Sequence, residues 1–274
     1  MSRTLVRAAL VAAVLVYVGV LVLAPVAAIV VAVARAGLGT IRATLSAPDV
    51  GHAFYLSTVI ALITVAVTTV LGVVTAYVLA RQSFPGKGLL DALADLPVAV
   101  SPVIVGLMAV LLFGRGGYFE PFFSARGIQV IFALPAMVLV TIFICIPFTI
   151  RAVVPVLQEA GVSEEEAART LGAGELRTFF SITLPRIRWG LAYGAALTAA
   201  RALGEIGAVL IVSGSLQGRT ETATLYIFRA LEERQDVAGY VVALVLAAVS
   251  IVLLLAIETA RRHVERRRLD PGGI

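Results

Sequence analysis

The chain has 274 residues, a net charge of +5 and a mean hydropathy of +1.00, with 60% apolar and 14% charged residues. Soluble domains carry about 25% charged residues, so this composition excludes a soluble domain and indicates an integral membrane protein. The basic residues gather at the ends of apolar runs rather than on one face, which argues against a nucleic-acid-binding surface. Cys145 is the only cysteine, and His52 and His263 are isolated, so we expect no internal disulfide and no metal site.

Six apolar runs are long enough to cross a bilayer, whose core of about 30 Å takes about 20 helical residues. They cover residues 8–34, 54–80, 93–113, 129–150, 189–213 and 237–258. The first run is longer than the apolar part of a secretory signal, so we interpret it as an uncleaved helix. The sequence therefore predicts an all-α integral membrane protein, a six-helix transmembrane bundle that forms a single domain over 1–274.

Basic residues set the orientation, because loops rich in arginine and lysine stay in the cytoplasm. Fourteen of the 22 basic residues fall on one side of the spans, seven fall on the other, and Arg201 lies inside the fifth span. The richer side holds Arg3, Arg7, Arg81, Lys87, Arg151, Arg169, Arg177, Arg186, Arg188, Arg261, Arg262, Arg266, Arg267 and Arg268. We therefore expect both termini, the 81–90 loop and the segment 163–185 to be cytoplasmic.

The segment 163–185 is polar and lies between the fourth and fifth spans. Ser163 and Glu166 have the spacing of a capping box at the start of a helix, and Gly172 is suited to end it. A small apolar face on this helix is formed by Ala167, Ala168 and Leu171. A second helix is expected over about 174–182, and Pro185 is expected to stop it. On these local grounds alone, a surface loop with ordinary capping explains the segment equally well.

The spacing within this segment resembles the EAA motif of ABC importer permeases. The matching positions are Glu166-Ala167-Ala168, Gly172, Ile182 and Leu184-Pro185. The resemblance implies that the first helix is a coupling helix in a groove of a separate ATP-hydrolysing subunit. It implies this role for Glu166, Ala167, Ala168 and Gly172, and the apolar face that includes Leu171 would fill the groove.

Other segments resemble the sulfate/thiosulfate permeases within this family, with molybdate permeases as near relatives. These segments are Phe84–Lys87, Asp95–Val103, Arg201–Ala208 and Val212–Gly214. Arg186–Gly194 and Gly218–Thr222 favour the W-type sulfate subunit over the T-type, and the match covers the core, roughly 54–258. The resemblance implies a heterodimer with a T-type permease, two ATPase copies and an extracytoplasmic sulfate-binding protein in the bacterial inner membrane. The chain has no Walker-type phosphate loop, so ATP and magnesium would be bound by the ATPase, with no cofactor in this chain.

Arg201 and Glu205 are interpreted as the only charged pair inside a span. Such charges face the bundle interior or water, and their spacing allows them to pair on one helix face. They either border an anion path or form a neutral structural pair, and Ser101 is a further path candidate. Gly204 and Gly207 are expected in the same helix, where they permit close packing.

Prolines are expected to interrupt or kink the third and fourth spans, at Pro97, Pro102, Pro135 and Pro147. Outside the membrane, 214–236 is expected to form a loop and an amphipathic helix, either interfacial or a surface for the binding protein. The alternatives to a sulfate permease are a permease for molybdate or another tetrahedral oxyanion, an ion-coupled secondary transporter, and a structural scaffold. A secondary transporter would predict charged sites in more than one span.

Overall fold

The computed structural model describes residues 3–269, and every regular element within that range is helical. The termini of the predicted domain, residues 1–2 and 270–274, lie outside the described residues. The longer helices are α1 (Arg3–Val18), α2 (Ala24–Leu45), α3 (Pro48–Arg81), α7 (Leu134–Ala160), α10 (Leu184–Leu203) and α13 (Asp236–Leu269). The shorter ones are α4 (Lys87–Ala99), α5 (Pro102–Phe113), α6 (Glu120–Ser124), α8 (Ser163–Thr170), α9 (Glu175–Thr178), α11 (Gly207–Ser213) and α12 (Ala223–Glu232). Two π-helical turns, η1 (Gly19–Leu23) and η2 (Phe179–Thr183), link α1 to α2 and α9 to α10.

The helices α3, α7 and α10 pack together at the centre of the molecule. Small residues permit this close approach, since a Cβ atom added at Gly72 of α3 would lie 2.7 Å from Cγ2 of Thr149 in α7. Gly190 and Gly194 of α10 face Val156 and Ala152 of α7 in the same way. Packing of this kind stabilises helices in lipid, where the solvent is as apolar as the side chains.

Four helical segments in the described residues are long and apolar enough to cross a membrane, and two bent pairs raise the number to six. The third predicted span is a pair, α4 and α5, with a bend of 105°. The fifth is α10, preceded by the helical turns from Glu175, followed by α11 after a bend of 55°. The number of candidate spans is consistent with the predicted six. The expected interruption of the third span by proline is confirmed, whereas the break in the fifth span was not predicted.

Proline explains the break in the third span. The residue before a proline is driven into extended backbone, and Ser101 has φ −58° and ψ 135° ahead of Pro102. Pro135 begins α7, where the missing N–H has no helical partner to lose. Pro97 and Pro147 lie inside α4 and α7 without ending them.

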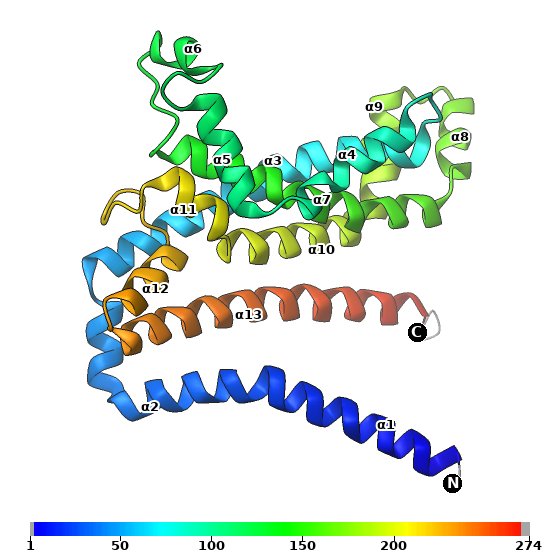
Figure 1. Cartoon of the computed structure of the whole chain (residues 1–274). Coiled ribbons are helices and arrows are strands. Elements are labelled where there is room, and N and C mark those ends of the chain that lie inside the picture. The colour runs from blue at the N-terminus through cyan, green and yellow to red at the C-terminus, as the bar shows by residue number, and fades with distance from the viewer. Residues whose placement is uncertain (1–2, 270–274) are drawn as a thin grey trace.

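The first span packs loosely against the rest of the chain. The most apolar window of Ala9–Leu45 has no buried residue, and α2 contacts α13 and the start of α3. A helix that is apolar on all sides and exposed in the isolated chain has a surface suited to lipid or to other membrane subunits. Figure 1 shows α13 between α10 and α2, and α13 contacts both, whereas α1 and α2 lie on the far side of α13 from the α3–α7–α10 centre.

The two ends of the molecule carry different elements. In Figure 1, α8 and α9 lie at the end where α1 begins and α13 ends, whereas α6, α11 and α12 lie toward the other end. The helix α3 runs lengthwise between these ends. With 34 residues at about 1.5 Å per residue, it is about 50 Å long.

Candidate functional site

The polar helix pair consists of α8 and α9 and lies between α7 and α10, as the sequence predicts. Gly161 (φ +65°) turns the chain from α7 into α8, and Gly172 (φ +85°) ends α8. The amide of Gly172 donates to the carbonyl of Arg169, and that of Ala173 to the carbonyl of Ala168. These two bonds form a Schellman motif with glycine in the left-handed position, so the predicted helix end at Gly172 is confirmed.

The predicted capping box is wrong. Val162 is the N-cap, no side chain makes a capping hydrogen bond, and the Glu166 amide donates to the Val162 carbonyl at 2.9 Å. The turn at Gly161 starts the helix one residue earlier than the pattern implies, so Ser163 is already helical. The side chain of Glu166 is exposed and free to meet a partner.

Pro185 does not stop the second helix, contrary to the prediction. The helix starts at Glu175, widens into η2 and continues as α10 through Pro185. In the π turn, the Leu184 amide donates to the carbonyl of Phe179, five residues back. Because a π turn is wider than an α turn, it accommodates the pyrrolidine ring and its missing N–H while the chain remains helical.

The helix pair and the following π turn η2 expose large apolar side chains around a groove. Leu171 is 88% exposed, Leu176 76% and Phe180 61%. The groove, of about 290 Å³, is lined by Ala168, Leu171, Gly172, Ala173, Arg177, Thr178, Ser181 and Ile182. Exposed apolar residues gathered in one place are typical of a binding surface.

A buried ion pair that sequence reasoning missed fastens α8 to the body. Arg81, the last residue of α3, donates to both carboxylate oxygens of Glu165, with Nη2 3.0 Å from Oε1. The same guanidinium donates to the carbonyls of Leu157 (2.8 Å) and Gly161 (2.6 Å), and the Thr183 hydroxyl donates to Glu165 Oε1 (3.0 Å). The two residues are 84 positions apart, so no local pattern signals their contact.

The predicted pair of Arg201 and Glu205 is present, but its setting differs from the prediction. Arg201 Nη1 lies 2.7 Å from Glu205 Oε2, and their side chains are 31% and 1% exposed. Glu205 lies in the break between α10 and α11, where its Oε1 accepts from the Ala208 amide at 2.9 Å. Gly204 and Gly207 flank this break, so the prediction that they share a helix is wrong.

The breaks in the third and fifth spans lie against each other. A Cβ atom on Gly207 would approach Cβ of Pro102 to 2.9 Å, and α5 packs along α11. Ser101 therefore lies close to the segment that contains Glu205, with its side chain exposed. Irregular backbone at membrane depth is tolerated where it is buried in protein or lines a water-filled cavity.

A second charged cluster lies on α4 and α7, the helices of the third and fourth candidate spans. Arg151 lies inside α7 rather than in a loop, with Nη2 2.8 Å from Asp91 Oδ1 of α4. The same guanidinium hydrogen bonds to Asp95 at 2.8 Å through Nε. These side chains are 40% to 50% exposed, so they lie at the surface of the isolated chain.

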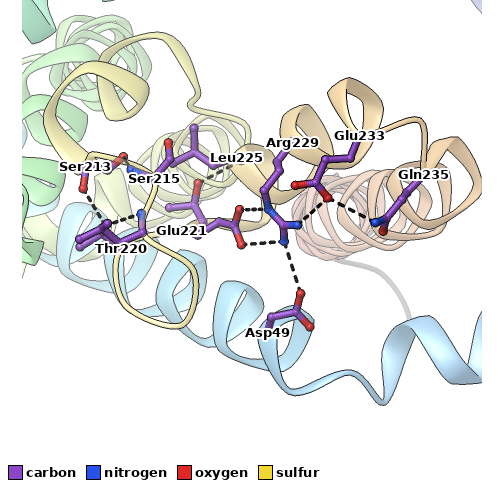
Figure 2. A network of polar contacts seen from close by, with 11 residues as sticks. Asp49, Ser213, Ser215, Thr220, Glu221, Leu225, Arg229, Glu233 and Gln235 are labelled. Carbon is purple, nitrogen blue, oxygen red and sulfur yellow. Dashed lines mark hydrogen bonds and ion pairs between the residues drawn. The ribbon is translucent and has the colours of Figure 1, made fainter.

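The predicted loop and amphipathic helix at 214–236 are confirmed, with α12 as the helix. Figure 2 shows Arg229 of α12 among three carboxylates from different segments. Its Nε lies 2.6 Å from Glu221, and its Nη atoms lie 3.1 Å from Glu233 and 3.3 Å from Asp49 at the start of α3. The hydrogen bond donated to Glu221 raises the pKa of the guanidinium above its ordinary value. The network ties α12 to α3.

The chain is similar to known membrane transport proteins. Residues 68–270 match the family described as "Binding-protein-dependent transport system inner membrane component". The chain is 42% identical to the "Sulfate transport system permease protein CysW" of Synechococcus elongatus, covering 93% of this chain and 89% of that protein. It is 35% identical to the "Sulfate transport system permease protein CysT" of Salmonella typhimurium, covering 92% and 91%.

A solved structure shares the fold. The chain superposes with a TM-score of 0.77 on a chain from the "Crystal structure of bacterial alginate ABC transporter in complex with alginate pentasaccharide-bound periplasmic protein". The match covers 99% of this chain and 97% of that chain at 17% identity. At this identity the likeness concerns the fold, which is that of an ABC transporter subunit.

Proposed function

This chain belongs to the family of inner membrane components of binding-protein-dependent transport systems, and on that premise we propose that it is the transmembrane permease subunit of an ATP-driven sulfate importer. The assignment of sulfate as the substrate depends on the 42% identity to a sulfate permease over 93% of the chain. Sulfate and thiosulfate are both tetrahedral divalent anions, so the proposal includes both.

The exposed helix pair supports coupling to a separate ATPase. In this proposal, α8 enters a groove of the ATPase with Ala167, Ala168 and Leu171, and Glu166 contacts its rim. Gly172 allows the turn that holds the two helices together. Two ATPase copies bind ATP and magnesium, one beneath this chain and one beneath a second permease of the T-type. ATP-driven closure of the two copies would move α8 and switch access to the anion path.

The arrangement of the two ends supports an orientation. Basic residues predict that the end with α8 and α9 is cytoplasmic, together with both termini. The opposite end, with α6, α11 and α12, then faces an extracytoplasmic sulfate-binding protein. In this proposal the single domain is a multi-pass inner membrane protein, and the coupling helix α8 lies at the end opposite α11 and α12 (Figure 1).

The two adjacent breaks support an anion path beside Ser101 and Arg201. The Arg201 side chain is partly exposed, whereas Glu205 beneath it is buried. A positive group that is partly neutralised attracts a divalent anion without holding it tightly, which suits passage. The second permease would complete the other wall.

Reconstitution tests the proposal. The chain is co-expressed with its genomic neighbours, purified and placed in vesicles with ATP inside and labelled sulfate outside. We expect an ATPase and a second permease to co-purify, and uptake to require both ATP and the binding protein. Uptake of molybdate with no uptake of sulfate or thiosulfate would contradict the substrate assignment, and uptake driven by an ion gradient without ATP would contradict the mechanism.

A further inference from the structure

Among the described residues, α8 has one buried side chain, Glu165, and that residue fastens it to the membrane body. A second ion pair joins α8 to α10, from Glu164 to Arg186, and these side chains are 60% and 37% exposed. In the pair of Arg81 and Glu165, the side chains are 8% and 6% exposed. Exposed ion pairs contribute little and are screened by salt, so the buried pair is the firmer of the two links.

The guanidinium of Arg81 joins three helices at one point. It reaches Glu165 in α8 and the Leu157 carbonyl in α7, and it ends α3. Thr183, just ahead of α10, donates to the same carboxylate. Removal of one partner would leave a buried charge uncompensated, so the pair strongly opposes separation of α8 from α3.

At its other end, α3 is held by a second ionic contact. Asp49, in its first turn, lies 3.3 Å from Arg229 of α12, the residue at the centre of the network in Figure 2. Between these contacts, α3 is an unbroken helix of 34 residues that packs on α7 and α10. A displacement of α8 therefore has a continuous rigid element along which to reach the opposite end of the molecule.

We propose that Arg81 and Glu165 form the joint through which α8 moves α3, and that α3 carries this movement toward α12. The proposal rests on the proposed coupling of α8 to an ATPase and adds the elements inside this chain that receive the motion. Arg81 and Glu165 are positioning residues here, because both are buried beneath the surface offered to the ATPase.

The test measures sulfate imported per ATP hydrolysed in the reconstituted complex. Glu165→Gln removes the charge but keeps the size of the side chain. We expect the ATPase to co-purify as with the unchanged chain, and sulfate per ATP to fall about tenfold, within the range that coupling between sites usually spans. The matched control is Glu159→Gln, at the same end, whose carboxylate is exposed and makes no ion pair with another described residue. We expect the control to transport normally.

Two results would overturn the proposal. One is unchanged sulfate per ATP in Glu165→Gln, and the other is loss of the ATPase from that variant, since Glu165 would then support docking rather than transmission. If Glu165→Gln does not accumulate in the membrane, Arg81→Lys keeps the charge but loses the forked contacts. The sulfate imported per ATP should then fall less, by about fivefold, at the low end of the range for coupled sites. An unchanged value would again overturn the proposal. If the unchanged chain neither binds an ATPase nor imports sulfate, the proposed function fails instead.

Discussion

At the scale of single residues, backbone conformation and charge fix α8 in different ways. Gly161 and Gly172 flank the helix with positive φ angles, which glycine adopts without the steric cost that a Cβ atom brings. Glu165 then binds the helix to Arg81. The glycine turns set the direction of α8. The ion pair attaches α8 to α3, so that in our proposal the two helices move together.

Replacing Gly172 with valine is expected to disturb the coupling surface without unfolding the membrane body. Valine at φ +85° is strained by roughly 1–2 kcal/mol, so the Schellman turn should open and shift α9 relative to α8. Apart from the two chain neighbours of Gly172, no described residue has an atom within 4 Å of an added Cβ, so the cost comes from the backbone rather than from a clash. We expect normal amounts of protein in the membrane and sulfate uptake reduced about tenfold, measured in vesicles with ATP inside.

The matched control for this position is Gly172→Asn. Asparagine tolerates the left-handed region better than valine does, so uptake should be largely retained. Full uptake by Gly172→Val, at equal amounts of membrane protein, would show that the turn is not needed for coupling.

The residue scale also shows the limit of local sequence patterns. Gly172 was predictable because its role depends on its own backbone and its immediate neighbours. The contact of Arg81 with Glu165 was not, because it depends on α3 and α8 meeting across 84 positions. Glu166, the motif residue, is exposed, whereas its neighbour Glu165 carries the buried contact.

At the scale of elements, hydropathy located the spans but not their breaks. An apolar window averages over a bend, so hydropathy alone does not indicate the breaks within 93–113 and 189–213. Ser101-Pro102 did contain a local signal for the first break, since a residue before proline favours extended backbone. The second break depends on tertiary contacts of Glu205, whose carbonyl accepts from the Thr224 hydroxyl of α12 at 2.8 Å.

The contact of α3 with α7 gives a prediction about stability. Gly72→Ala places a Cβ atom 2.7 Å from Thr149, and overpacking of this kind costs about 1–3 kcal/mol. Gly51→Ala in the same helix adds a Cβ atom in open space and should be neutral or stabilising by up to about 1 kcal/mol. Thermal unfolding in detergent should show a lower midpoint temperature for Gly72→Ala than for the unchanged chain. Gly51→Ala should not lower the midpoint. Equal midpoints for the two variants would mean that α3 and α7 separate readily at this contact.

At the scale of the whole molecule, two candidate functional regions lie toward opposite ends, and long helices join these ends. The helix pair and its exposed leucines lie at one end, and the Arg229 network lies toward the other (Figures 1 and 2). The first span is apolar and unburied in the described residues, so its surface is suited to lipid. This division is what an importer needs, since its motor and its substrate donor act on opposite faces of the membrane.

The proposed orientation predicts which positions a reagent outside the membrane can reach. Ser83 lies in the exposed loop beside α8, and Leu216 is 48% exposed in the loop before α12. Because Cys145 is fully buried, cysteines placed at these positions should be the main targets of a membrane-impermeant maleimide. We expect Leu216→Cys to be labelled in intact spheroplasts, and Ser83→Cys only after the membrane is permeabilised. The reverse pattern would place α8 outside the cell, where no ATP is available, and would remove the basis for coupling through this helix.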